Sequence, residues 1–81
     1  MIAVLFFGRM ADLAGQRRVD VPAAGGDSLF ALRDRLLGDA LRDGRVAPEA
    51  VHMSLNKTVR RDDAPVADGD EVAFFSVFSG G

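Results

Sequence analysis

Both ends of this chain carry segments that are apolar on both faces of an extended strand. Every residue of Ile2–Phe7 is apolar, and Ser76 is the single polar position in Val72–Phe78. Strands of this kind are covered on both sides in a folded protein. A chain of 81 residues forms one small domain with a single core. We therefore predict that the first and last strands pair in parallel at the centre of one sheet.

The sequence between these segments predicts one main helix. Asp27 or Ser28 can cap its first turn, because either side chain accepts a hydrogen bond from a free backbone amide. An apolar stripe with helical spacing follows, formed by Leu29, Leu32 and Leu36. Gly38 is expected to end this helix, and the polar connection over residues 39–49 has room for one further helical turn.

Shorter elements surround this helix. A helical turn is predicted over Arg9–Ala14, with Gly15 in the left-handed position that follows a helix. The remaining strands are expected over Arg18–Val21, Ala50–Leu55, Thr58–Arg60 and Glu71 to about Phe78. This order favours an α+β roll of the β-grasp kind, a mixed sheet with one main helix packed on one face. We assign residues 1–78 to this domain and residues 79–81 to a flexible tail.

One main helix covers only one face of such a sheet, whereas the two richest strands are apolar on both faces. Phe7, Phe75 and Phe78, or their neighbours on the same face, are therefore expected to form an exposed apolar patch. Patches of this kind usually mark a partner surface. The alternative is that residues 39–49 fold over the second face and cover it.

Few side chains here carry catalytic chemistry. The chain contains no cysteine, which excludes thiolate nucleophiles, disulfides and sulfur-ligated metals. His52 is the single histidine, and its alternation with apolar neighbours places it on the wetter face of a strand. The aspartates of Asp62–Asp63 and of Asp68 and Asp70 lie beside proline or glycine, as turn formers commonly do. We expect no metal site and no enzyme that acts on its own.

The charge pattern and the apolar runs indicate which partners and which location to expect. The net charge is −2, and the ten basic residues are scattered apart from the doublets Arg17–Arg18 and Arg60–Arg61. We interpret both doublets as solvated strand ends and expect no nucleic-acid partner. The longest apolar run is too short to cross a bilayer and lacks the flanks of a signal peptide. We therefore expect a cytoplasmic protein without a membrane partner.

The chain ends in Ser79-Gly80-Gly81, directly after the apolar last strand. Glycine has no Cβ and adopts backbone conformations closed to other residues. An arm of this composition can therefore pass through a narrow channel and present its terminal carboxylate to an enzyme. A rigid body for recognition joined to a mobile end for chemistry is the design of a carrier.

These residues resemble the family of molybdopterin synthase small subunits, which are ubiquitin-related sulfur carriers. The resemblance extends over essentially the whole chain. Its matching segments are Ile2–Gly8, Asp12–Gly15, Leu55–Lys57, Asp68–Phe75 and Ser79–Gly81. The chain departs from the family at Ala11–Asp12, where an Arg-Glu pair is common, and at Ser76–Val77, where two prolines are common. Without those prolines the exit of the tail is less stiff.

The resemblance implies a function that depends on the tail. An E1-like enzyme would use ATP to adenylate the Gly81 carboxylate, and a persulfide protein would supply sulfur to give a thiocarboxylate. Gly80 would keep the arm slender. The tail would then enter a larger subunit of a heterotetrameric molybdopterin synthase and donate sulfur to cyclic pyranopterin monophosphate, which builds the dithiolene. Phe7, Phe75, Phe78 and Ser79 would contact the partner, and this chain would bind no cofactor itself.

Three other functions stay open at this point. A sulfur carrier for thiamine thiazole, cysteine or tRNA thiolation would share the fold and the tail. A ubiquitin-like protein modifier would join Gly81 to a lysine of a target protein. In a plain binding module the last two glycines would be dispensable.

Overall fold

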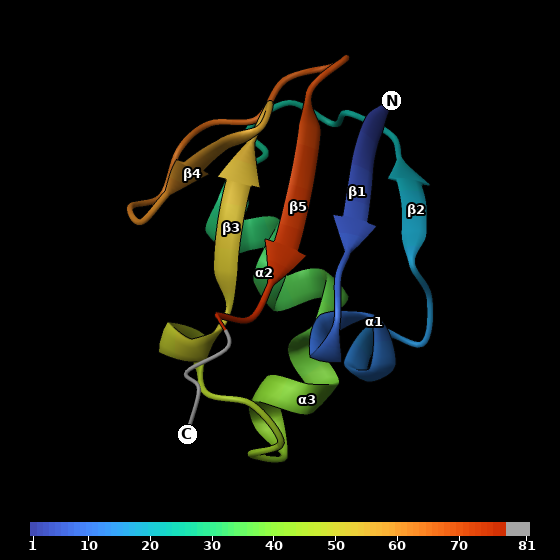
Figure 1. The fold of residues 1–81 in the computed structure, drawn as a ribbon. Coiled ribbons are helices and arrows are strands. Elements are labelled where there is room, and N and C mark those ends of the chain that lie inside the picture. Colours follow the sequence, from blue (N-terminus) through green and yellow to red (C-terminus); the bar gives the residue numbers. More distant parts are fainter. Residues whose placement is uncertain (78–81) are drawn as a thin grey trace.

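The computed structural model describes residues 1–77 and contains one five-stranded mixed sheet with its helices on one face (Figure 1). The strand order is β2-β1-β5-β3-β4. The strands are β1 (Ile2–Phe6), β2 (Arg18–Val21), β3 (His52–Leu55), β4 (Thr58–Arg60) and β5 (Glu71–Phe75). β1 and β5 pair in parallel, whereas the other neighbours are antiparallel. The predicted central parallel pair is confirmed.

The inner face of this pair forms the middle of the core. Val4 lies beside Val72, and Phe6 lies beside Phe74, whose ring stacks on that of Phe6 at a centroid distance of 5.9 Å. Because side chains alternate along a strand, the residues between them point to the opposite face. The core-facing residues of β1 and β5 are almost fully buried.

The helices cover the inner face of the sheet. They are α1 (Arg9–Ala14), α2 (Leu29–Leu36) and α3 (Gly38–Arg42), followed by the 3₁₀ turn η1 (Pro48–Ala50). Of the two predicted caps, Ser28 is the one used for α2, since its Oγ accepts from the Ala31 N–H at 3.1 Å. Asp63 adds a second acceptor from a distant loop, for the Phe30 N–H at 2.9 Å. The predicted left-handed Gly15 after α1 is confirmed, at φ 74°.

α2 ends at Leu36, just before the predicted end at Gly38, and a second short helix begins at Gly38 itself. The break occurs at Leu37, with φ −114°, and Gly38 is the buried first residue of α3. A Cβ at Gly38 would lie 3.0 Å from Arg42 Nη1, the end of a flexible and exposed side chain that has room to move. α3 buries Ala40, and Val46 joins the core after it. Residues 39–49 therefore stay with the helices at the end of the sheet (Figure 1).

Two strand boundaries also differ from the prediction. The third strand begins at His52 instead of Ala50, because Pro48 starts a turn of 3₁₀ helix that runs through Ala50. Proline suits the first position of such a turn, where its missing N–H costs nothing. The last strand ends at Phe75, whereas the prediction extended it to about Phe78, which lies outside the described residues.

The tight turn between β3 and β4 is hydrogen-bonded to the start of β5. Asn56 and Lys57 both have positive φ, at 50° and 70°, as a tight two-residue hairpin requires. The Asn56 side chain accepts from the Glu71 N–H at 2.9 Å and donates to Asp70 Oδ1 at 3.0 Å. Asp70 Oδ2 accepts from the Ala67 N–H at 2.8 Å. Two segments that are distant in sequence are thereby joined at one end of the sheet.

These hydrogen bonds make the contribution of Asp70 to stability depend on pH. The Ala67 backbone N–H, and then the Asn56 amide, favour the ionised carboxylate and lower the pKa of Asp70 from its ordinary value of 3.8. Because the pKa of Asp70 is lower in the folded state than in the unfolded state, its ionised carboxylate stabilises the fold. This stabilisation is complete above the unfolded pKa and is lost as the pH falls through the folded pKa.

We predict that Asp70→Asn is less stable than the wild type at neutral pH, and that the difference narrows as the pH falls below about 4. Urea unfolding at a series of pH values measures this. Asp62→Asn, which removes an exposed carboxylate that forms no ion pair within residues 1–77, is the control. A difference for Asp70→Asn that stays constant down to pH 3 would show that its hydrogen bonds do not depend on ionisation.

Candidate docking face

The face of the sheet opposite the helices carries no covering segment within residues 1–77 (Figure 1). One row of side chains runs across it from Leu5 through Ala73 and Ser54 to Val59, because these residues are register neighbours on adjacent strands. None of the four carries a charge. The alternative in which residues 39–49 cover this face is wrong, since these residues pack with the helices.

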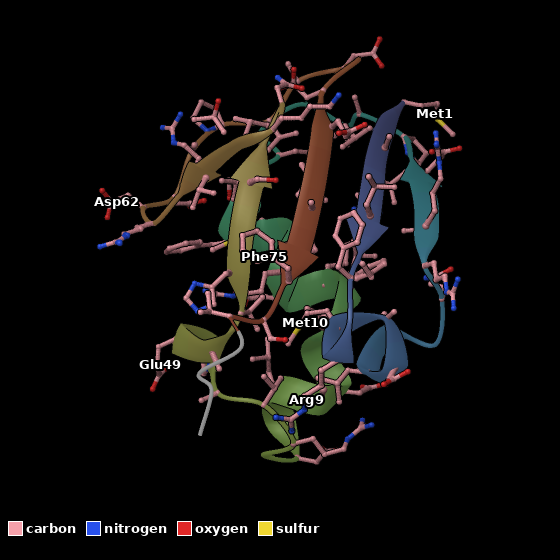
Figure 2. All side chains as sticks on the ribbon, in the orientation of Figure 1. Met1, Arg9, Met10, Glu49, Asp62 and Phe75 are labelled. Atoms are coloured by element: carbon pink, nitrogen blue, oxygen red, sulfur yellow. The ribbon has the colours of Figure 1, made fainter. Side chains whose placement is uncertain are left out.

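A second row lies nearer the end of β5 and is aromatic. His52 and Phe75 are register neighbours, and their rings stack at a centroid distance of 5.9 Å. Figure 2 shows Phe75 on the side of the sheet that faces away from the helices. Phe7 follows β1, and its N–H donates to the Phe74 carbonyl at 3.0 Å, which extends the pairing of the two central strands by one residue.

Several of these apolar side chains are open to solvent. Phe7 is 52% exposed, Val59 is 61% exposed and Val77 is 59% exposed, while Leu5 and Phe75 are half-buried. We call these five residues the open-face strip. The apolar surface expected on the uncovered face is present, although Phe75 is less exposed than Phe7 because it stacks on His52.

The strip lies where the chain leaves the sheet. β5 ends at Phe75, and Ser76 and Val77 are the last described residues. The Oγ of Ser76 lies 4.0 Å from the position a Cβ would take on Gly8, whose φ of 55° and ψ of −129° favour glycine. Of the predicted site residues, Phe78, Ser79, Gly80 and Gly81 lie outside the described part of the chain.

The aspartates that could have suggested a metal site have structural partners. Asp63 accepts from two backbone amides, and Asp70 accepts from one amide and from Asn56. Asp68 pairs with the amino group of Met1, which lowers the pKa of its carboxyl. The predicted turn-forming role is confirmed for Asp68 and Asp70, which lie in a turn closed by the Asp70 N–H and the Ala67 carbonyl at 3.0 Å, whereas Asp63 accepts from the first turn of α2 instead. In the part of the chain that the structure describes, no group of three or more acidic or histidine side chains could hold a metal ion.

The sequence predicts Phe7 and Phe75 of the strip directly, and Leu5 as a neighbour of Phe7 on the same face, but it does not predict Val59 or Val77. Val59 was assigned to a short strand without a face, although its pairing with Ser54 places it on the open face. An apolar residue between Thr58 and Arg60 was the available signal. Val77 was noticed as a departure from the proline of the family, but its exposed side chain was not predicted.

The comparisons with known proteins agree with this geometry. A model of the ThiS family matches residues 4–81. The chain belongs to the ThiS family. The molybdopterin synthase sulfur carrier subunit of Escherichia coli (strain K12) is 37% identical over 87 aligned residues, which cover 100% of both chains. The family resemblance drawn from the sequence is confirmed.

Solved structures support the fold of this ThiS family member. The crystal structure of SAMP1 from Haloferax volcanii gives a TM-score of 0.77 at 26% identity, covering 99% of this chain and 98% of that one. The solution structure of Urm1 from Trypanosoma brucei gives 0.67 at 24% identity, covering 99% and 94%. The predicted β-grasp fold is confirmed. Among the described residues, no helix is long and apolar enough to span a membrane, and the cytoplasmic location stays a prediction.

The two faces of the sheet should respond differently to truncation of a phenylalanine. Phe74 is fully buried, so Phe74→Ala is expected to cost about 3–5 kcal/mol of unfolding free energy. Phe7 is half exposed, so Phe7→Ala is expected to cost less than about 1 kcal/mol. Urea unfolding of the two variants measures this, with Phe74→Leu as a milder core variant. Equal losses for Phe7→Ala and Phe74→Ala would contradict an open face.

Proposed function

We propose that this ThiS family member is the sulfur carrier subunit of a molybdopterin synthase, with the Gly81 carboxylate as the group that carries sulfur. The observation that supports this most is the full-length match to the Escherichia coli sulfur carrier subunit, together with a family match that runs through Gly81. The described residues form a rigid body with an apolar face beside the point where the tail begins. That arrangement suits a carrier that is recognised through its body and reacts through its end.

The chemistry begins with activation, because a carboxylate is a poor acylating agent. An E1-like enzyme transfers AMP from ATP to the Gly81 carboxylate, releases pyrophosphate and leaves an acyl-adenylate. The terminal sulfur of a persulfide on a donor protein attacks the acyl carbon and displaces AMP. A thiol then cleaves the sulfur–sulfur bond of the acyl disulfide, and the chain retains a thiocarboxylate. ATP and the pterin are held by the partner proteins in this scheme.

Sulfur leaves the carrier in the active site of the large subunit. The tail enters that site, with Gly80 keeping it slender. The thiocarboxylate sulfur bonds to a side-chain carbon of cyclic pyranopterin monophosphate and displaces the oxygen which that carbon carried. Water then hydrolyses the resulting thioester and restores the Gly81 carboxylate. Two transfers supply the two sulfur atoms of the dithiolene. The chain performs no catalysis alone and acts as the sulfur-donating subunit of the complex.

The open-face strip is the proposed docking surface for the large subunit. Phe7 and Phe75 lie on it, and Phe78 and Ser79 extend the proposed contact toward the tail. Removing this apolar surface from water favours the complex by about 25 cal/mol for each Å², and the lost freedom of the two proteins on association offsets part of that gain. Docking also holds the tethered end at a high effective concentration near its target.

A protein modifier is the second candidate, and one observation favours it. Two solved structures of a small archaeal modifier protein from Haloferax volcanii match this fold with TM-scores of 0.77 and 0.70, both at 26% identity. In that function the acyl-adenylate of Gly81 passes to a lysine amine of a target protein. Thiamine, cysteine or tRNA sulfuration would use the same thiocarboxylate with another acceptor.

We predict that one alanine added after Gly81 abolishes sulfur loading, because the activating enzyme would no longer meet a Gly-Gly carboxylate. The assay combines the protein with its activating enzyme, ATP and a persulfide donor, followed by mass spectrometry of the C-terminal peptide. A variant with one alanine added before Met1 is the control and should load normally. Loading of the C-terminally extended protein, without trimming, would contradict the proposed chemistry.

A further inference from the structure

The two arginine doublets of the sequence lie on opposite edges of the sheet, on either side of the open-face strip. Arg18 is the register neighbour of Leu5 on β2, and the Arg17 carbonyl accepts from the Phe6 N–H at 2.9 Å. On the other edge, Arg60 is the register neighbour of the buried Met53, so it lies at the helix-facing side of β4, and Arg61 follows it at the end of the strand. The sequence interpretation as unrelated strand ends did not predict this arrangement.

Each doublet lines a groove that it shares with the strip. The groove beside β2 has a volume of about 660 Å³, and Arg17 and Arg18 line it together with Leu5 and Phe7. The groove beside β4 has a volume of about 720 Å³, and Arg60 and Arg61 line it together with Val59, Phe75 and Val77. The second groove curves round the sheet edge, because Phe30 of α2 and the core residue Met53 line it as well. Arg18 therefore borders the strip on the open face itself, whereas Arg60 and Arg61 border it from the edge of β4.

Three of these four arginines form no ion pair with a carboxylate of residues 1–77. Arg18 pairs with Asp20 at 3.1 Å, whereas Arg17, Arg60 and Arg61 form no ion pair there. One carboxylate lines each groove, Asp12 beside β2 and Glu49 beside β4. The second groove also contains Arg33, which pairs with Asp34 at 2.8 Å. Each groove thus holds more cations than carboxylates, in a chain whose net charge is −2.

The acidic residues of the open face lie toward its other end. Asp20 and Glu71 are both register neighbours of Ala3, two residues along β1 from Leu5. Asp70 immediately precedes β5 at that end. The open face therefore has an acidic end and, where the tail begins, an apolar end with arginines at both edges.

We propose that the two doublets, Arg17–Arg18 and Arg60–Arg61, recognise carboxylates on the partner that receives the tail. That partner is predicted to present an apolar centre for the strip, with one acidic cluster on each side. Four strand spacings separate β2 from β4, so the two clusters lie about 19 Å apart. Arginine suits this role because its planar guanidinium binds a carboxylate through two hydrogen bonds and stays charged at every physiological pH.

Charges at the rim of an interface act chiefly on the association rate and on its dependence on salt. The Debye length is about 10 Å at 0.1 M salt and about 3 Å at 1 M. The contribution of the doublets is therefore expected to be large in dilute buffer and small in concentrated salt, while the apolar contact of the strip persists in both. Measuring binding at low and at high salt therefore separates the contribution of the arginines from that of the open-face strip.

The choice of partner rests on the proposed function, so the test uses the large subunit of molybdopterin synthase from the same organism. Two charge-reversed variants, Arg17→Glu/Arg18→Glu and Arg60→Glu/Arg61→Glu, are compared with Arg35→Glu/Arg42→Glu. Arg35 and Arg42 are exposed on α2 and α3, on the helical side. The association rate and Kd are measured by surface plasmon resonance at about 0.1 M and about 1 M salt. Urea unfolding confirms that each variant is folded.

We expect each doublet reversal to slow association and weaken binding about tenfold at low salt, with the difference falling toward twofold at high salt. The control reversal should change binding less than about twofold. Lysine replacements at each doublet should keep the wild-type dependence on salt, because the charge is kept, but lose part of the affinity, because an ammonium group cannot bind a carboxylate in the same two-bond geometry. If the wild type binds and the doublet variants lose no more affinity than the control variant, this inference is wrong while the proposed function stands. Failure of the wild type to bind at all would contradict the proposed function, and this inference with it.

Discussion

The parallel pairing of β1 with β5 is the contact on which the rest of the structure depends. It brings the first and last strands of the chain side by side, so Phe6 stacks on Phe74 at 5.9 Å and the core forms around that pair. It also places Phe7 beside the end of β5, where the chain continues toward the tail. The residues that would recognise a partner and the residues that would react are thus held by one pair of strands.

A single layer of helices accounts for the other main feature, an apolar sheet face open to solvent. Phe7, Val59 and Val77 each leave more than half of the side chain's surface in water, as their exposures of 52%, 61% and 59% show. Isolated apolar residues on a surface are common, but here they gather on one face, beside the start of the tail. Their exposure weakens the hydrophobic stabilisation of the free protein and leaves apolar area for association.

The sequence predicted the features that follow from alternation and helical spacing, namely the central strand pair, the main helix and the uncovered face. It failed where a local choice depended on distant contacts. The hydrogen bonds of Asn56 with Asp70 and Glu71 join segments that no local pattern connects. The opposed arginine doublets required the register of four strand pairs, which a single sequence does not reveal.

The central claim is that the end of the chain carries sulfur while the folded body directs it to a partner. The most direct measurement is intact-mass and C-terminal peptide analysis of the protein isolated from its own cells, during active cofactor synthesis. The account predicts a population in which one oxygen of the Gly81 carboxylate is replaced by sulfur. A population consisting only of the free carboxylate and of conjugates to lysine amines would contradict it.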